Sequence, residues 1–342
     1  MKSLSKYSMQ YWLLLALSTF AFFGEAIAAE VVVYSARNEQ LIKPLFDAYT
    51  KETGVKVKFA TDKEGPLLAR LKAEGRNSPA DVLLTVDAGN LWQAVNEGLL
   101  QPLESEVLQK NIPHHLRDPE HYWIGLSVRS RTLVYNTARL QPSQLSSYED
   151  LADPRWRGRL CLRTSKKVYN QSLVAMLIEA YGEAKTEAMV RGWVANLAAD
   201  PFPDDTKAME AVAAGQCDVT LVNTYYFGRL MQDKPKLPLA IFWPNQAAGG
   251  KHAGVHVNVS GAGLTKHAKN RQEAVRLLEW LSSEKAQNLY ADVNLEYPVN
   301  PRVKPDPLVA SWGSFSQNLI NVSAAGKLQA RAVMLMDRAG YK

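Results

Sequence analysis

Short apolar segments that alternate with helix-periodic segments constrain the fold of this chain more than any other feature. In the first third, strand-like runs at 31–34, 55–59 and 81–85 are separated by helical patterns near 41–49, 66–74 and 89–97. Strands that alternate with helices favour a largely parallel sheet with helices on both faces. The sequence therefore predicts an α/β fold, beginning with an α/β lobe.

A second α/β unit follows a basic, strand-like segment at 127–136. The expected elements of this unit are a strand at 159–163, helices at 171–181, 185–197 and 206–214, and a strand at 218–222. Apolar residues at 255–259 and 261–263 predict a strand that passes back to the first lobe, with helices at 271–282 and 283–290 after it, and the last helix, 328–339, is expected on the second lobe. We expect an N-terminal lobe of residues 29–128 and 259–305 and a C-terminal lobe of residues 129–258 and 306–342.

The N-terminal segment has the features of a secretory signal peptide. Lys2 and Lys6 precede an apolar run at residues 12–23, and small residues follow at 26–28. The run is shorter than the ~20 residues of a membrane-spanning helix. We expect residues 1–28 to be removed and the mature protein to be periplasmic. Residues 29–342 exceed what one core usually organises, which also favours two lobes.

The charge and the cysteine content restrict the classes of partner and of metal site that the sequence supports. The chain has 40 Lys and Arg against 34 Asp and Glu, a net charge of +6, without a basic run, so nucleic-acid binding is poorly supported. Cys161 and Cys217 both lie at or near expected strands of the second lobe. A disulfide between them is geometrically possible in the periplasm, and the sequence leaves it open. Neither cysteine has zinc-ligand spacing to another Cys or His.

Three tyrosines are the candidate metal ligands: Tyr169, Tyr225 and Tyr226. Phenolate oxygen is a hard anionic ligand that suits a hard, highly charged cation, so the set indicates ferric ion. Tyr169 precedes an expected helix and the pair follows an expected strand, which places all three in a cleft between the lobes. Joint ligation by the pair requires a turn from strand to helix, because successive side chains of a strand point to opposite faces. Thr224 is the expected N-cap of that helix. Taken alone, such a pair is more often half-buried packing.

With these tyrosines and the surrounding motifs considered together, the chain resembles the periplasmic ferric-ion-binding proteins of bacterial iron ABC importers. The resemblance runs through motifs along nearly the whole mature sequence: Tyr34-Ser-Ala-Arg37, Ser78-Pro-Ala-Asp-Val-Leu-Leu-Thr85, Leu151-Ala-Asp-Pro-Arg-Trp-Arg-Gly158, Tyr169-Asn-Gln-Ser172, Asn223-Thr-Tyr-Tyr226, Val257-Asn-Val-Ser-Gly261 and Glu296-Tyr-Pro298. It implies a two-lobed, class II substrate-binding fold with transferrin-like lobes, a hinge and an interlobe cleft. It also implies a monomer that delivers ferric ion to an inner-membrane ABC permease.

The resemblance also implies roles for individual residues. Tyr169, Tyr225 and Tyr226 match the family's iron-ligand positions, and Arg37 and Arg129 match positions that can hold a synergistic anion such as carbonate. The charges of ferric ion, three phenolates, carbonate and two arginines then sum to zero.

The departures from the family pattern lie on the first lobe. Asn38 and Glu39 stand where many relatives carry His, often followed by Tyr. Val86 and Asp87 stand where some relatives carry a ligand Glu. Glu39 as a carboxylate ligand is the alternative to the anion.

Other functions have less support in the sequence. No nucleophile elbow, zinc-protease motif or phosphate-binding glycine loop occurs, so we expect a binding protein and not an enzyme. The alternative is a receptor on the same fold for a small oxyanion or organic acid without a metal. We expect His252 and His256 to be structural. Arg229, one helical turn past the tyrosine pair, is a candidate hydrogen-bond donor to a phenolate.

Overall fold

The computed structural model describes residues 29–342, so the predicted signal peptide lies outside the described residues. The strands are β1 (Glu30–Ser35), β2 (Lys56–Thr61), β3 (Val82–Val86), β4 (Leu100–Gln101), β5 (Ile124–Asn136), β6 (Leu160–Cys161), β7 (Val219–Asn223), β8 (Leu239–Phe242), β9 (Val257–Thr265) and β10 (Tyr297–Pro298). The longer helices are α1 (Glu39–Thr53), α2 (Glu64–Glu74), α3 (Ala88–Asn96), α5 (Val168–Tyr181), α6 (Glu183–Ala195), α7 (Asp205–Ala213), α8 (Thr224–Asp233), α9 (Arg271–Leu281), α10 (Glu284–Asn294) and α13 (Gln329–Arg338). Three short helices are α4 (Glu106–Asn111), α11 (Pro307–Ala310) and α12 (Ala324–Lys327).

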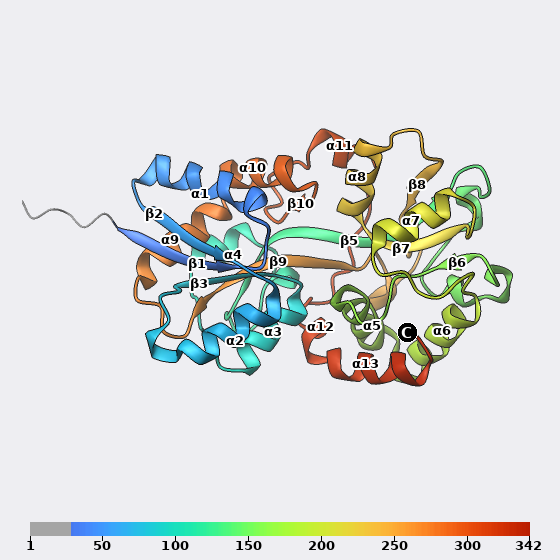
Figure 1. Ribbon diagram of the computed structural model, residues 1–342, viewed down its shortest axis with the longest axis horizontal. Coiled ribbons are helices and arrows are strands. Elements are labelled where there is room, and N and C mark those ends of the chain that lie inside the picture. The colour runs from blue at the N-terminus through green and yellow to red at the C-terminus, as the bar shows by residue number, and fades with distance from the viewer. Residues whose placement is uncertain (1–28) are drawn as a thin grey trace, which may run out of the picture.

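The first lobe is built on the parallel strands β2, β1 and β3, in that order, with β9 antiparallel to β3. The strands are apolar on the faces that helices cover, and α1 packs with Ile42, Leu45, Phe46 and Tyr49 buried. Figure 1 shows this lobe at the left, with α1, α9 and α10 on one side of the sheet and α2 and α3 on the other. The expected α/β lobe is confirmed.

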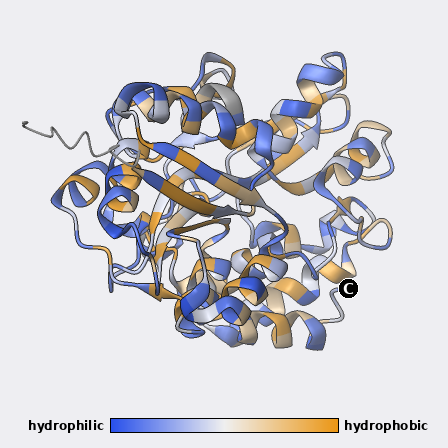
Figure 2. Cartoon of the chain, turned by 60° about the vertical axis from the view of Figure 1, so that its left-hand side comes forward, coloured by the Kyte–Doolittle hydropathy of each residue, from blue (hydrophilic) through white to orange (hydrophobic). Residues whose placement is uncertain are grey.

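The second lobe has β5 between β7 and β8, and β6 parallel to β7 at the edge. Helices α5, α6 and α13 bury one hydrophobic cluster that includes Trp156, Trp193 and Leu335. A smaller cluster around Met209 and Phe227 lies under α7 and α8. In Figure 2 apolar residues follow the central strands, whereas the outer helices carry apolar and polar residues on different faces.

Two long strands join the lobes. Residues 124–130 of β5 pair with β9 in the first lobe, and residues 131–136 pair with β7 and β8 in the second. Figure 1 shows β5 and β9 running side by side from one lobe to the other. They are antiparallel, because the chain crosses once in each direction. The expectation of a largely parallel sheet is therefore wrong for the centre of the molecule and holds only for β2–β1–β3 and β6–β7.

The C-terminal segment is shared between the lobes. Val309, Val322 and Ala325 belong to the hydrophobic cluster of the first lobe, whereas Ala332 and Leu335 belong to that of the second. The last helix, α13, thus packs on the second lobe as expected. The exact lobe boundaries at 128/129, 258/259 and 305/306 stay a prediction.

A disulfide joins Cys161 at the end of β6 to Cys217 just before β7, with a Cα–Cα distance of 5.9 Å. This decides the question that the sequence left open, and it ties the edge strand of the second lobe to its neighbour. Among the helices of residues 29–342, none combines the length and apolar character that a membrane span requires.

Candidate metal centre

A cleft of about 510 Å³, including space open to solvent, lies between the lobes and contains all three candidate tyrosines. The first lobe and the crossing strands line it with Ala36, Arg37, Asn38, Leu41, Glu64, Val86, Arg129 and Glu296, and the second lobe with Tyr169, Tyr225, Tyr226 and Arg229. The predicted convergence of Tyr169 with the distant tyrosine pair is therefore present in the fold.

Helix starts position the three tyrosines. Tyr169 is the second residue of α5, and Tyr225 and Tyr226 lie in the first turn of α8, which begins where β7 ends. This is the strand-to-helix turn that joint use of the pair requires, and the two rings lie with centroids 4.4 Å apart. Helix N-termini carry partial positive charge, which favours phenolate over phenol. The N-cap is Asn223, and not Thr224 as expected; the Thr224 hydroxyl instead accepts a hydrogen bond from the Ser130 amide at 3.4 Å.

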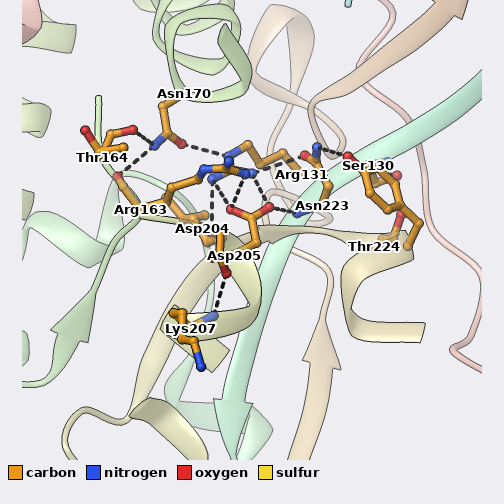
Figure 3. A network of polar contacts seen from close by, with 12 residues as sticks. Ser130, Arg131, Arg163, Thr164, Asn170, Asp204, Asp205, Lys207, Asn223 and Thr224 are labelled. Atoms are coloured by element: carbon orange, nitrogen blue, oxygen red, sulfur yellow. Dashed lines mark hydrogen bonds and ion pairs between the residues drawn. The ribbon is translucent and has the colours of Figure 1, made fainter. Parts of the chain in front are cut away.

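A buried arginine fixes the two tyrosine-bearing helices relative to each other (Figure 3). Arg131 on β5 donates to Asn170 Oδ1 at 2.9 Å and to Asn223 Oδ1 at 3.1 Å, the residues adjacent to Tyr169 and to α8. Its charge is balanced by Asp205 at 3.0 Å, which also accepts from the Asn223 amide at 2.9 Å. Since Arg131 and Asp205 are almost completely buried, this network is a rigid base for the site.

Cationic side chains surround the tyrosine rings. Tyr169 has Arg129, Arg163 and Lys167 at 5.9, 5.5 and 5.0 Å from its ring centroid. Arg163 is also 6.0 Å from the Tyr226 ring, and Arg229 is 5.0 Å from that of Tyr225. Positive charge at these distances favours anions in the cleft, whether phenolate or a bound oxyanion.

Without a cation the phenols hold their protons firmly. Burial raises the pKa of Tyr169 to about 12, although Arg129 acts in the opposite direction. Burial also raises the pKa of Tyr225 well above its ordinary value, and its neighbours Tyr169 and Tyr226 add to the effect. The two side chains are only 7% and 6% exposed. A ligand that uses them as phenolates must therefore displace protons.

Arg37 and Arg129 both border the cleft but differ in how they are held. Arg37 is an ion-pair partner of Glu296 at 3.1 Å and also donates to Ser260 and Asn294. Arg129 donates to Ser260 at 2.7 Å and has no ion-pair partner within 4.0 Å among residues 29–342, while the Nε atoms of both arginines lack a hydrogen-bond partner in that part of the chain. The simple charge balance expected from the sequence omits Glu296, which offsets the charge of Arg37.

The candidate site residues of the first lobe differ in where they lie relative to the cleft. Asn38 lines the cleft, whereas Glu39 is exposed at the start of α1 and is not among the residues that border the cleft. Asp87 is buried behind the cleft wall. Glu64, which begins α2, is the half-buried carboxylate on this side of the cleft.

Sequence reasoning assigned no role to Glu64, Glu296 or Arg163. An acidic residue at a helix start suggests only a favourable dipole interaction, and Glu296 appeared only as part of a family motif. Arg163 lies six residues before Tyr169 and carried no signal of its own. Neither His252 nor His256 borders the cleft: the His252 ring stacks on Tyr181 at 4.1 Å, and His256 is buried in the enclosed space behind the cleft.

Comparison with known proteins agrees with this geometry. A family model described as bacterial extracellular solute-binding protein matches residues 77–311. The chain is 44% identical over 319 residues to the iron uptake protein A1 of Synechocystis, covering 92% of this chain and 88% of that protein. It is 31% identical over 338 residues to the Fe(3+)-binding periplasmic protein of Serratia marcescens, covering 96% of each.

The fold of a solved iron-binding protein matches as well. The Trichodesmium protein IdiA (FutA), in complex with iron and citrate ligands, superimposes with a TM-score of 0.88 at 44% identity, covering 92% of this chain and 100% of that one. These relatives are periplasmic or extracellular binding proteins of transport systems. The chain therefore belongs to the bacterial extracellular solute-binding proteins, in the group that contains the ferric-iron uptake proteins.

Proposed function

We propose that this protein is the periplasmic receptor of a ferric-ion ABC importer, which binds Fe³⁺ through the phenolate oxygens of Tyr169, Tyr225 and Tyr226. The observation that carries the proposal is the convergence of these three tyrosines in one cleft, within 5.0–6.0 Å of four cationic side chains. The cargo is then handed to an inner-membrane permease, and the protein acts as a monomeric carrier and not as an enzyme.

The energetics select a trivalent cation. Each pKa unit corresponds to about 1.4 kcal/mol, so holding the Tyr169 phenol deprotonated at pH 7 costs about 7 kcal/mol. A trivalent ion offsets this cost through strong bonds to hard anionic oxygens, and a divalent ion does so less well. Binding should release protons, weaken in acid and be lost when iron is reduced.

A synergistic anion completes the coordination shell in this proposal. Three phenolates leave positions for a bidentate oxyanion such as carbonate, and the Trichodesmium relative is described with citrate beside its iron. Arg129 is the better candidate to hold the anion, because Arg37 already pairs with Glu296. Arg37 then contributes mainly by keeping Glu296 in place.

Closure of the lobes would trap the ion. The lobes meet along β5 and β9, whose backbone pairing continues through the crossing, so bending of these strands gives a hinge. Iron favours the closed state because it is then contacted by groups from both walls. Glu39 is not needed in this arrangement, since it lies outside the cleft.

The test is a visible spectrum of purified protein titrated with ferric citrate, with and without bicarbonate. Ferric-phenolate charge transfer should give a visible band, and the double variant Tyr225→Phe/Tyr226→Phe should lose the band and most of the affinity. Tyr297→Phe is the matched control, because Tyr297 is buried beside Phe315 and does not line the cleft.

A receptor for a metal-free oxyanion is not favoured by the relatives, and it gives the opposite result: no colour with iron in the parent protein. An iron titration of the double variant that matched the parent would exclude the tyrosine assignment.

A further inference from the structure

Asp87 forms a contact between the lobes directly behind the tyrosines. It follows β3 in the first lobe and is 1% exposed. Its Oδ1 accepts two hydrogen bonds, one from the Gly89 amide at 2.9 Å and one from the Ser172 hydroxyl at 2.5 Å. Gly89 belongs to α3 and Ser172 to α5, so one carboxylate oxygen joins a helix start in the first lobe to a helix start in the second.

Ser172 is three residues after Tyr169 on α5. Residues three apart in an α-helix lie on the same side, one turn from each other. The hydrogen bond from Ser172 therefore restrains the turn of α5 that carries Tyr169. The Arg131 network holds the same turn from within the second lobe through Asn170, whereas Asp87 reaches it from the other lobe.

The backbone at Asp87 is strained and well anchored. Its φ of 75° lies in the left-handed region, which non-glycine residues adopt only where the surroundings enforce it. The Asp87 amide donates to the Val259 carbonyl at 2.8 Å, and the next amide, that of Ala88, donates to Asn258 Oδ1 at 2.8 Å. Both partners are on β9, so Asp87 is fixed to a strand that crosses between the lobes.

The second carboxylate oxygen faces the site from behind. Asp87 Oδ2 is buried with no hydrogen-bond partner within residues 29–342, and Asp87 shares an enclosed space with Arg129, Tyr169, Asn223 and Asn258. The Asp87 carboxyl group thus lies beside the arginine and the tyrosine that the proposed function assigns to the anion and the iron.

We propose that Asp87 is a positioning residue for Tyr169, an inference that rests on the proposed function. Asp87 is attached to β9, which crosses between the lobes, and its carboxylate accepts the hydrogen bond of Ser172 on α5. This hydrogen bond holds the first turn of α5 in the orientation that places Tyr169 for ligation. Neither residue contacts the iron.

The test is the variant Ser172→Ala, which removes the hydroxyl and leaves Asp87 in place. We expect an iron affinity roughly tenfold lower, since one hydrogen bond to a buried charged group is lost. We also expect a charge-transfer band about one-third weaker per bound iron, because one of three phenolates is misplaced. A purely structural role would lower thermal stability and leave the band per bound iron unchanged.

Three further variants make the result decisive. Ser172→Thr retains the hydroxyl and should restore the band. Asp87→Gly removes the carboxylate at a position whose φ of 75° glycine tolerates, should weaken the band in the same direction, and serves if Ser172→Ala folds poorly. Thr186→Ala removes an equally buried hydroxyl, bonded to the Gly182 carbonyl just before α6, and should leave the band unchanged.

The outcomes separate the two proposals. A parent band with unchanged bands in Ser172→Ala and Asp87→Gly would overturn the role of Asp87 alone. A parent without a visible band would overturn the proposed function and this inference with it.

Discussion

The two lobes contribute to the cleft in different ways. The second lobe supplies three tyrosines on two helix starts that a single buried network, Arg131 with Asp205, holds together. The first lobe and the crossing strands supply charged groups from separate elements: Glu64 on α2, Arg37 after β1 and Glu296 before β10. One wall is a preorganised set of candidate ligands, whereas the other is a set of charges whose position depends on closure.

This difference gives the two lobes separate roles in the proposed metal site. Ligands held within one rigid lobe keep their mutual geometry in the open state, so iron can be captured before the lobes close. The first lobe then excludes water, balances charge and, through Asp87, restrains the helix turn that carries Tyr169. Of the departures from the family pattern, Asn38 and Val86 fall on this wall, whereas Glu39 lies outside the cleft.

The largest expected effect comes from breaking the network of the second lobe. Arg131→Met removes the nearer of the two arginines that pair with the buried Asp205 and leaves it only Arg163, at 3.5 Å, and we expect the free energy of unfolding to fall by about 3–5 kcal/mol. The iron band should weaken as well, because Asn170 and Asn223 lose their common donor. Urea denaturation measures the stability. Arg155→Met, which breaks an exposed pair with Asp150, should cost no more than about 1 kcal/mol. Equal losses in the two variants would contradict the network's role.

Reduction of the Cys161–Cys217 disulfide should affect the second lobe alone. The bond closes a long loop there, and its loss should lower stability by about 2–4 kcal/mol. Differential scanning calorimetry with and without dithiothreitol should show an earlier transition for this lobe, while the first lobe keeps its own. A Cys161→Ser/Cys217→Ser variant should no longer respond to the reductant. A downward shift of the transitions of both lobes would contradict the expectation that the disulfide stabilises the second lobe alone.

Mild acid should weaken the region where the lobes meet. Burial, with Arg131 and Arg129 nearby, lowers the pKa of His256 to about 3, against about 6.5 in the unfolded chain. The folded state therefore holds a neutral ring that the unfolded state protonates below pH 6.5, and stability is full above that pH and falls as the pH drops towards 3. We expect a loss of about 2 kcal/mol between pH 6.5 and 5. In the His256→Gln variant the urea midpoint should depend less on pH in this window. An unchanged pH dependence would contradict the assignment of the effect to His256.

The smallest effect should distinguish two carboxylates of the first lobe. Glu64→Gln removes a charge that borders the cleft, and we expect iron affinity to change by about 1 kcal/mol, roughly fivefold. Glu39→Gln, at an exposed position outside the cleft, should leave the affinity unchanged. Competition with citrate measures both. A larger effect at Glu39 would restore it as a ligand and show that the first wall moves on closure so that Glu39 enters the cleft.

Much of the fold could be predicted because local periodicity is strong in the long elements. The helices α1, α5 and α9 and the strands β1, β3 and β7 lie where the apolar spacing placed them. The short strands β4, β8 and β10 were missed, since two to four residues carry little periodic signal. The antiparallel centre was missed for another reason: a strand's direction in a sheet depends on which way the chain crosses, and not on its own residues.

The candidate site could likewise be predicted only in part from the sequence. The adjacency of Tyr225 and Tyr226, the third tyrosine and the resemblance of the surrounding motifs indicated a hard metal and its candidate ligands. The partners of those residues had no local signal, because Arg131 meets Asp205 across 74 positions and Arg37 meets Glu296 across 259.

The amino-acid order thus specified the α/β elements, the tyrosine set and the chemistry of a hard trivalent cation, because residue type and short-range spacing carry that information. Only the folded chain decided that Arg37 is neutralised by Glu296, that Cys161 bonds Cys217, that Glu64 and not Glu39 faces the cleft, and that Asp87 joins the lobes. These are contacts between distant segments. They depend on how the two lobes are arranged around β5 and β9, which no short stretch of sequence encodes.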